Sequence, residues 1–228
     1  MIYLTGDVHL PYDVSKLRYF KEQNNLTRDD YVIVLGDFGL LWKKDSDTYK
    51  QWLKWFNQRK YTLLWLDGNH ENHELINSYP VEMWNGGKVH KISDNVIHLM
   101  RGQVFSIQEN TFFTMGGAWS IDKSYRIDRI SWWQEEEPNH NEMEEGFKNL
   151  ESHNNEVDYV LTHTCPFSII TEMFQPTVIY NSVTESYLDE IKNKIKYKKW
   201  YFGHWHKDVS YNTYVCLYNK IVKLGDGV

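Results

Sequence analysis

The sequence contains few cysteines and no long hydrophobic run. Cys165 and Cys216 are its two cysteines in 228 residues, so a disulfide framework is not implied and a reducing compartment is the default. No window holds about 18 consecutive apolar residues, and the N-terminus lacks the basic and apolar regions of a signal peptide. We therefore expect a soluble, cytoplasmic protein with no membrane partner.

Basic residues are too few for a broad nucleic-acid-binding surface. The chain has 25 Lys and Arg against 31 Asp and Glu, which gives a net charge of −6. Proteins that hold long DNA or RNA draw much of their affinity from neutralising phosphates with Lys and Arg. Long nucleic acid is therefore not an expected partner, whereas a small phosphorylated molecule fits if metal ions supply positive charge locally.

Internal repeats and low-complexity tracts are also absent, and the hydrophobic content of 41% suffices for one well-buried core. We expect a single domain over residues 1–228. Within it, residues 116–138 are irregular, charged and rich in Trp. In a compact domain such a segment is usually either a functional lid on the substrate side or a disordered excursion.

Hydrophobic periodicity predicts alternating strands and helices in the first third of the chain and short antiparallel strands after it. The expected helices cover 14–25, 48–56, 72–79, 141–152 and 184–194. The expected strands cover 2–5, 31–35, 61–66, 88–92, 96–100, 103–108, 111–115, 157–161 and 200–202, with two or three more in 209–224 around a turn at 218–220.

Polar residues follow the first three buried runs at the points where those runs stop. Asp7, Asp37 and Asn69 each come directly after a glycine, and they are separated by 30 and 32 residues. That spacing is about the length of one strand-helix-strand unit. Three parallel strands would therefore deliver these oxygen ligands to one edge of a sheet, where α/β proteins bind their ligands.

Histidines add nitrogen ligands at a matching spacing. His9 lies two residues after Asp7, and His204 lies two residues before His206, so each pair projects to one side of an extended segment. Taken singly, any of these histidines would more often be a hydrogen-bonded surface or core residue than a ligand. Together, carboxylate, imidazole and amide oxygen suit Mn²⁺, Fe or Zn²⁺ better than Ca²⁺.

Five short motifs in this order resemble the motif set of the calcineurin-like metallophosphoesterases, and the resemblance spans nearly the whole chain. The motifs are Gly6–His9, Gly36–Asp37, Gly68–Glu71, Thr162–His163 and Gly203–His206. The resemblance implies an α/β fold, a four-layer α/β/β/α sandwich around two divalent metal ions. Mn²⁺ is the first expectation for these ions, with Fe or Zn²⁺ as alternatives.

The resemblance also implies a role for each matching residue. Asp37 would bridge the two ions, and His70 would act as the general acid or contact the phosphate. The first ion would be held by Asp7, His9 and His206, and the second by Asn69, His163 and His204. The implied reaction is hydrolysis of a phosphomonoester or phosphodiester by a hydroxide held between the ions.

The sequence departs from the protein Ser/Thr phosphatases of this superfamily. Those enzymes have an Asp-Arg pair shortly after the second motif, whereas Phe38–Trp42 follows here without an arginine. Protein phosphatase activity is therefore in doubt. Arg126 in the irregular segment could bind the phosphate instead, because a guanidinium donates hydrogen bonds in pairs. A solvated or salt-bridged surface role for Arg126 is the open alternative.

We predict a binuclear metal-dependent phosphoesterase that acts on a small phosphorylated or nucleotide-like substrate. One alternative is a nuclease on short single strands, which the tryptophans favour and the acidic balance disfavours. Another is a metal-site scaffold for protein binding, against which the retained His70 argues, since a scaffold needs no proton donor. No feature of the sequence predicts an oligomeric state.

Overall fold

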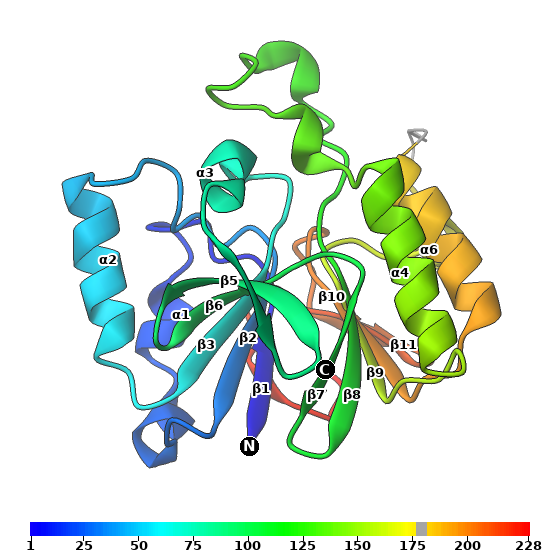
Figure 1. Cartoon of the computed structure of the whole chain (residues 1–228), viewed down its shortest axis with the longest axis horizontal. Coiled ribbons are helices and arrows are strands. Elements are labelled where there is room, and N and C mark those ends of the chain that lie inside the picture. The colour runs from blue at the N-terminus through cyan, green and yellow to red at the C-terminus, as the bar shows by residue number, and fades with distance from the viewer. Residues whose placement is uncertain (177–181) are drawn as a thin grey trace.

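The computed structural model describes residues 1–176 and 182–228, which form two β-sheets packed face to face between two layers of helices (Figure 1). This arrangement confirms the predicted four-layer α/β/β/α sandwich. In the described residues the first sheet has the strand order β13-β1-β2-β3-β6-β5-β4, and the second has the order β11-β12-β10-β9-β8-β7.

The strands are short, and most of them agree with the runs expected from the sequence. In the first sheet they are β13 (Val222–Lys223), β1 (Ile2–Thr5), β2 (Tyr31–Leu35), β3 (Thr62–Leu66), β6 (Val96–Leu99), β5 (Gly87–Ser93) and β4 (Val81–Trp84). In the second they are β11 (Val209–Tyr211), β12 (Tyr214–Cys216), β10 (Lys199–Phe202), β9 (Tyr159–Thr162), β8 (Asn110–Met115) and β7 (Gln103–Ile107).

The helices cover the outer faces of the two sheets. The α-helices are α1 (Ser15–Arg18), α2 (Asp47–Asn57), α3 (His73–Asn77), α4 (His140–Ser152), α5 (Phe167–Phe174) and α6 (Val183–Lys194). Three 3₁₀ helices are η1 (Lys21–Asn25), η2 (Lys123–Tyr125) and η3 (Gln134–Glu136). Among the described residues, no helix has both the length and the apolar character needed to cross a membrane.

Strand β3 shows how the sequence produces the layers. All five of its residues are buried. Leu64 and Leu66 lie in the core between the sheets, while Leu63 and Trp65 lie in a second core beneath α1 and α2. Because successive side chains of a strand point to opposite faces, a strand covered on both sides needs an unbroken apolar run. A third core lies between the second sheet and α4 to α6.

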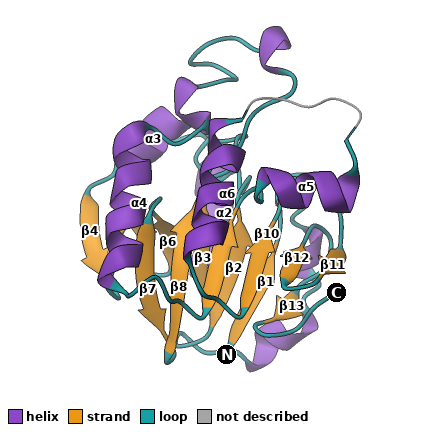
Figure 2. Cartoon of the chain, turned by 90° about the vertical axis from the view of Figure 1, so that its right-hand side faces the viewer, coloured by secondary structure: helices purple, strands orange, loops and turns teal. Residues whose placement is uncertain are grey.

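Parallel pairing brings the strand ends to one edge. β1, β2 and β3 are parallel neighbours, as are β8, β9 and β10 in the other sheet. The carboxyl ends of these strands therefore open onto the same side of the molecule (Figure 2). The loops that carry the sequence motifs all leave from this side.

The helix predicted over residues 14–25 is interrupted. The chain is helical only over α1 and η1, and Phe20 between them is extended, with φ −62° and ψ 106°. Phe20 is buried, and its ring packs edge-on with that of Tyr3, with the two ring centroids 4.9 Å apart. Packing this aromatic ring on the first sheet offsets the helical hydrogen bonds lost there. Strand β4 and helix α5 were not predicted.

The C-terminal region contains three strands, and the chain turns between β12 and β13 at residues 218–220, as expected. A second turn, at residues 212–213, joins β11 and β12 in a hairpin. The backbone N–H groups of Tyr218, Asn219 and Lys220 donate to the carboxylate of Asp208 at 2.8–3.1 Å. This cap redirects the chain toward the first sheet, where β13 pairs with β1.

Residues 116–138 connect β8 to α4 and contain only η2 and η3 as helical turns among these described residues. The segment leaves the motif edge and projects above both sheets, as the green loop at the top of Figure 1. The two ends of the segment are joined by a backbone hydrogen bond of 3.0 Å, which the N–H of Ala118 donates to the carbonyl oxygen of Glu136. The segment therefore stands directly beside the motif loops.

Candidate metal centre

The seven predicted metal ligands lie on loops that leave the shared edge of the sheets. Two groups of side chains at this edge have possible ligand atoms within 4.8 Å of one another: Asp7, Asp37 and His163 form one, and His9 and Asp37 form the other together with the predicted general acid His70. Asp37 belongs to both groups. The arrangement brings together ligands from both sheets: Asp7, His9, Asp37, Asn69, His163, His204 and His206.

Asp37 lies at the centre of the site, and its two carboxylate oxygens face different partners. Oδ2 is 3.2 Å from Nε2 of His9, and Oδ1 is 3.4 Å from Nε2 of His163. Oδ1 also accepts a hydrogen bond of 2.7 Å from the backbone N–H of His70, which fixes the rotamer. A carboxylate in this position can present one oxygen to each of two cations.

Asp7 has an unsatisfied oxygen in the protein interior. Its side chain is fully buried, and Oδ1 accepts a hydrogen bond of 3.0 Å from the backbone N–H of His204. Oδ2 lies 3.3 Å from Nε2 of His206 but has no hydrogen-bond partner within residues 1–176 and 182–228. Because a buried carboxylate oxygen without a partner is costly, this atom fits a bound cation.

His163 and Asn69 present a second set of acceptor atoms. Nδ1 of His163 donates to the carbonyl oxygen of Leu35 at 2.7 Å, so Nε2 is the atom that points into the site. There it lies 3.1 Å from Oδ1 of Asn69. Neutral imidazole nitrogen, amide oxygen and the Asp37 carboxylate all offer lone pairs here, and a divalent ion would satisfy them together. The donor set therefore fits the ions that the resemblance implies.

The pKa values at the site show strong coupling between acids and histidines. Burial alone would lower the pKa of His163, but the negative charges of Asp37 and Asp7 raise it to about 9. Burial would raise the pKa of Asp37, yet His163 holds it well below its usual range. Without an ion, a proton on His163 neutralises the buried carboxylates. A divalent cation would displace that proton.

The backbone is strained at four of these ligands. His9, Asp37, His204 and His206 have φ values of +38°, +50°, +64° and +47°. Non-glycine residues seldom adopt this left-handed region, and each such residue costs on the order of 1–3 kcal/mol. Four such residues among the seven predicted ligands indicate that the directions of these side chains are maintained at a cost in local stability.

Two motif glycines are required because a side chain would collide with the ligands. A Cβ atom added to Gly36, whose φ is +94°, would lie 2.0 Å from Nδ1 of His163. A Cβ atom added to Gly68 would lie 2.0 Å from Oδ1 of Asp37. These glycines therefore let the strand ends approach closely enough for the side chains to meet.

Three supporting residues were missed by sequence reasoning. Asp13 holds Nδ1 of His9 at 2.8 Å, an arrangement common behind metal-binding histidines. Lys16 donates to the carbonyl oxygen of Asp7 at 2.6 Å, and Glu71 accepts a hydrogen bond of 2.7 Å from the N–H of Phe38. The one available signal was for Glu71, which follows His70 directly and ends the Gly68–Glu71 motif.

His70 and Arg126 meet at the rim of the site. The guanidinium Nη2 of Arg126 donates to Nε2 of His70 at 3.1 Å, so His70 carries its own proton on Nδ1 when neutral. Burial is the main cause that lowers the pKa of His70, and Arg126 lowers it further. Arg126 is also held by both carboxylate oxygens of Asp122, at 2.7 and 2.9 Å. The projecting segment thus reaches the predicted catalytic histidine.

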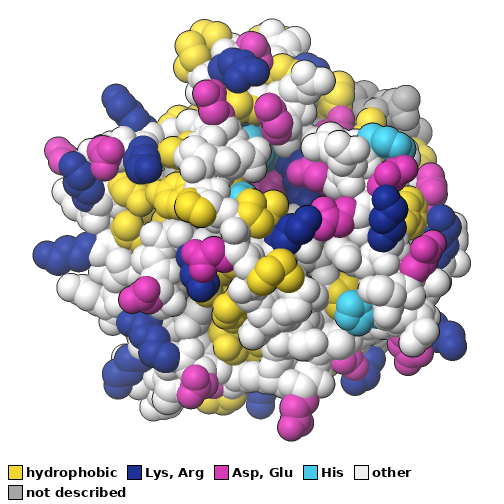
Figure 3. Space-filling view, in the orientation of Figure 1, with side chains coloured by type: hydrophobic (Ala, Val, Ile, Leu, Met, Phe, Trp, Pro, Cys, Tyr) yellow, Lys and Arg dark blue, Asp and Glu magenta, His cyan; other side chains and the backbone are white. Residues whose placement is uncertain are grey.

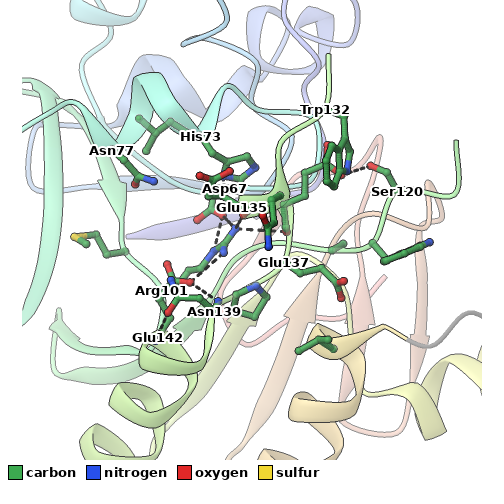
Figure 4. Close-up of a pocket in the computed structure, with 18 of the residues that line it drawn as sticks. Asp67, His73, Asn77, Arg101, Ser120, Trp132, Glu135, Glu137, Asn139 and Glu142 are labelled. Carbon is green, nitrogen blue, oxygen red and sulfur yellow. Dashed lines mark hydrogen bonds and ion pairs between the residues drawn. The ribbon is translucent and has the colours of Figure 1, made fainter. Parts of the chain in front are cut away.

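A cavity of about 430 Å³ lies beside the metal centre, beneath the projecting segment. Figure 3 shows a hollow in this part of the surface, with histidine and basic side chains inside it. In Figure 4, Arg101 reaches toward Asp67 and Glu142 at the floor of the cavity. Asp67 accepts hydrogen bonds from Nε of Arg101 at 2.7 Å and from Nε2 of His98 at 3.1 Å.

The Asp67 cluster is neutralised by the protein itself. Burial would raise the pKa of Asp67, but Arg101 and then His98 hold it far below its usual range. His73 lines the same cavity, with Nδ1 3.9 Å from Oδ2 of Asp67, and burial lowers its pKa to about 3. Sequence reasoning did not identify Asp67, His73 and Arg101 as members of one buried cluster.

Comparison with known sequences identifies a family. The model of the family described as calcineurin-like phosphoesterase matches residues 1–208 of this chain. No curated protein matches the sequence.

Two solved structures resemble the fold. One is named as a 5′-nucleotidase from Staphylococcus aureus, with a TM-score of 0.48 and 14% identity; the match covers 94% of this chain and 48% of that one. The other is phosphopantetheinyl hydrolase from Mycobacterium tuberculosis, with a TM-score of 0.43 and 16% identity; the match covers 96% of this chain and 89% of that one. The chain spans about half the length of the first.

Proposed function

The chain belongs to the calcineurin-like phosphoesterase family, and on that premise we propose that it is a single-domain, binuclear metal-dependent phosphoesterase. The observation that supports this most directly is the pair of buried aspartates. Asp37 directs its two oxygens at two groups of ligands, and Asp7 keeps an oxygen without a hydrogen-bond partner in the described part of the chain. Both features are expected of a site that is completed by cations.

In this proposal Asp37 is shared by the two ions. The first ion would be held by Asp7, His9 and His206, and the second by Asn69, His163 and His204. When bound, two such ions lower the pKa of a water molecule, so that it can attack phosphorus, and neutralise the phosphoryl oxygens. Mn²⁺ is the ion we would add first, because the ligand set mixes carboxylate, imidazole and amide oxygen.

The remaining steps belong to the side chains of this chain. Asn69 contributes an oxygen without a charge, which keeps the site positive toward an anionic substrate. His70 stands at the rim and, as an imidazolium with a proton on each ring nitrogen, would donate one proton to the leaving alkoxide and return to neutral imidazole. Arg126 would exchange its hydrogen bond to His70 for one to the phosphoryl group, because a guanidinium donor binds a charged oxygen more strongly than a neutral nitrogen.

The substrate that fits best is small, such as a phosphomonoester or a nucleotide-like phosphodiester. The cavity beside the metal centre can take the part of a substrate that lies beyond the phosphate. Trp119 and Trp132 line it, but Lys123 already lies over their rings at 5.0 and 4.0 Å. These tryptophans are therefore engaged with the segment itself, which weakens the case for a nuclease that stacks successive bases on them.

The proposal is tested with p-nitrophenyl phosphate and bis-p-nitrophenyl phosphate, using protein stripped with a chelator and then supplied with Mn²⁺. We expect turnover only after metal addition. Asp37→Asn should abolish it, and His70→Ala should reduce it by about 10²- to 10⁴-fold, as for other general acids. His140→Ala is the matched control, since His140 is 79% exposed and pairs with Glu144 far from the motifs.

The outcomes separate the candidate functions. Equal turnover by wild type and both site variants would rule out the enzymatic proposal. Mn²⁺ binding without hydrolysis of any phosphate ester would favour the metal-site scaffold. Cleavage of a short single-stranded oligonucleotide in preference to both nitrophenyl esters would favour the nuclease. A panel of nucleotides, cyclic nucleotides and dinucleoside polyphosphates would then identify the substrate class by phosphate release.

A further inference from the structure

Asn69 poses an orientation problem that the histidine and aspartate ligands do not. Its amide oxygen can bind a cation, whereas its amide nitrogen cannot, and the two ends of the group have nearly the same shape. A flip of the amide would turn the nitrogen toward the metal centre. A hydrogen-bond acceptor on the nitrogen side of the amide would keep the oxygen facing the ion.

Ser120 and Glu136 form a directed hydrogen-bond chain behind Asn69. The amide Nδ2 of Asn69 donates to Oγ of Ser120 at 3.0 Å, and the hydroxyl of Ser120 donates to Oε2 of Glu136 at 2.5 Å. The three residues are 3%, 3% and 2% exposed. Because the serine hydroxyl donates to Oε2 of Glu136, the serine oxygen is left to accept from the amide, and this sets the direction of the whole chain.

We propose that Ser120 and Glu136 are positioning residues of the metal centre, which hold the Asn69 amide with its oxygen facing the second ion. The proposal rests on the proposed function, because Asn69 is a ligand only in that scheme. Both residues come from the projecting segment 116–138, so this segment would help to complete the metal site. Partners behind a ligand typically change metal affinity by about 10- to 100-fold.

Glu136 is itself held in place by the base of the segment. Its backbone carbonyl accepts from the N–H of Ala118 at 3.0 Å. The carbonyl of its neighbour Glu135 accepts from Nη2 of Arg101 at 2.7 Å, which ties the same turn to the buried Asp67 cluster (Figure 4). The carboxylate of Glu136 therefore stays directed at Ser120, and the oxygen of Asn69 stays 3.1 Å from Nε2 of His163.

The test is a calorimetric titration of Mn²⁺ into metal-stripped protein. The wild type should bind two ions. Ser120→Ala and Glu136→Leu should weaken one of the two binding steps about tenfold or more and leave the other unchanged, because Asn69 belongs to one ion only. Glu136→Gln should retain both steps, since its side-chain carbonyl can still accept from the serine. Excess Mn²⁺ should restore the turnover of Ser120→Ala.

Ser131→Ala is the matched control within the same segment. Oγ of Ser131 accepts from the N–H of Ile127 at 3.0 Å and, in the residues that the structure describes, contacts none of the seven ligands. This variant should lose a hydrogen bond of the segment without changing either affinity. Circular dichroism on each variant shows whether the fold is kept.

Two results would overturn the positioning role. Unchanged affinities in Ser120→Ala would show that the hydrogen bond contributes only to packing, and an equal loss in Ser131→Ala would show that only the general order of the segment matters. The wild-type titration separates these results from a failure of the proposed function. A wild type that binds no Mn²⁺ would remove the metal centre, whereas two bound ions with an unaffected Ser120→Ala would remove only the present inference.

Discussion

Two clusters of buried charged residues lie next to each other at this edge of the protein. They differ in whether protein side chains satisfy the hydrogen bonds and charges of their carboxylates. In the metal centre, Asp7 and Asp37 face histidines, and one oxygen of Asp7 has no hydrogen-bond partner in the described residues. In the neighbouring cluster, both oxygens of Asp67 accept hydrogen bonds from Arg101 and His98. A buried carboxylate needs a counter-charge: in the first group only a proton on His163 offsets two carboxylates, whereas the second contains the guanidinium of Arg101 beside Asp67.

The largest expected effect comes from removing charge from the incomplete group. Asp7→Asn should lower metal-dependent turnover about 1,000-fold, because several kcal/mol of metal-based stabilisation are lost at tenfold per 1.36 kcal/mol. The metal-free protein should be at least as stable as wild type. Burial and repulsion from Asp37 raise the pKa of Asp7, and an amide can still accept from the N–H of His204.

The measurement is the free energy of unfolding by urea in the presence of a chelator, together with turnover in Mn²⁺. A large fall in metal-free stability in Asp7→Asn would contradict the comparison, because it would mean that the protein alone stabilises this carboxylate. Retained turnover would contradict the metal centre.

The next largest effect should come from the completed group, and it should appear in stability. Asp67→Asn leaves the buried guanidinium of Arg101 with only Glu142, 3.4 Å away, as a counter-charge, and breaking such a buried pair typically costs about 3–5 kcal/mol of unfolding free energy. Arg101 is only 5% exposed at its side chain, so water cannot replace the carboxylate easily. The affinity for Mn²⁺ should change much less than the stability.

The double variant Asp67→Asn with Arg101→Met provides the control. It removes both charges together, so it should recover part of the stability lost in the single variant. If Asp67→Asn is as stable as wild type but no longer binds Mn²⁺, then Asp67 belongs to the metal centre and the distinction between the two groups is wrong.

The two groups should also respond to pH in opposite directions. The pKa of His163 is raised to about 9, so without metal its stabilisation is complete below about pH 6.5 and is lost as the pH rises through 9. In the Asp67 group, burial lowers the pKa of His73 to about 3, and it lowers the pKa of His90, whose Nδ1 lies 3.1 Å from Nδ1 of His98, to about 4. Their contribution is complete above about pH 6.5 and is lost as the pH falls through 4 and then 3.

Metal binding should invert the pH dependence of the first group only. Because an ion displaces the proton of His163, Mn²⁺ affinity should rise by up to about tenfold per pH unit between pH 6.5 and 8. The measurement is thermal unfolding with and without Mn²⁺ at several pH values. The increase in Tm caused by Mn²⁺ should become larger as the pH rises. The same increase at pH 6.5 and pH 8 would mean that His163 is not a ligand.

The two groups also differ in how much of each could be predicted from the sequence. Apolar runs that end at glycine and a polar residue located the strand ends and brought Asp7, Asp37 and Asn69 to one edge, because parallel pairing follows from local pattern. Asp67 also follows a buried strand directly, and nothing in its local sequence distinguishes it from a ligand. Its partner Arg101 is 34 residues away and belongs to another strand-loop unit.

Other features depended on similarly distant contacts. The chain leaves its helix at Phe20, whose ring packs against Tyr3, and the turn at 218–220 is capped by Asp208 through the N–H of Tyr218. Ser120 lies 51 residues from Asn69 in an irregular segment without a periodic pattern. Sequence patterns predict where each helix or strand forms, whereas the pairing of distant residues depends on how these elements pack together.

The smallest expected effect distinguishes the two arginines. Nε and Nη2 of Arg101 bond buried acceptors, whereas Arg126 donates through Nη2 to a neutral histidine nitrogen at the rim. Only the second arginine can transfer a donor to a phosphoryl oxygen, and a hydrogen bond to a charged group contributes about 1.5 kcal/mol. Arg126→Gln should therefore raise KM about tenfold, with little loss of stability. A fall in kcat at unchanged KM would show instead that Arg126 acts by orienting His70. Arg126→Lys discriminates further, because an ammonium keeps the charge but cannot hold Asp122 and the phosphate at once.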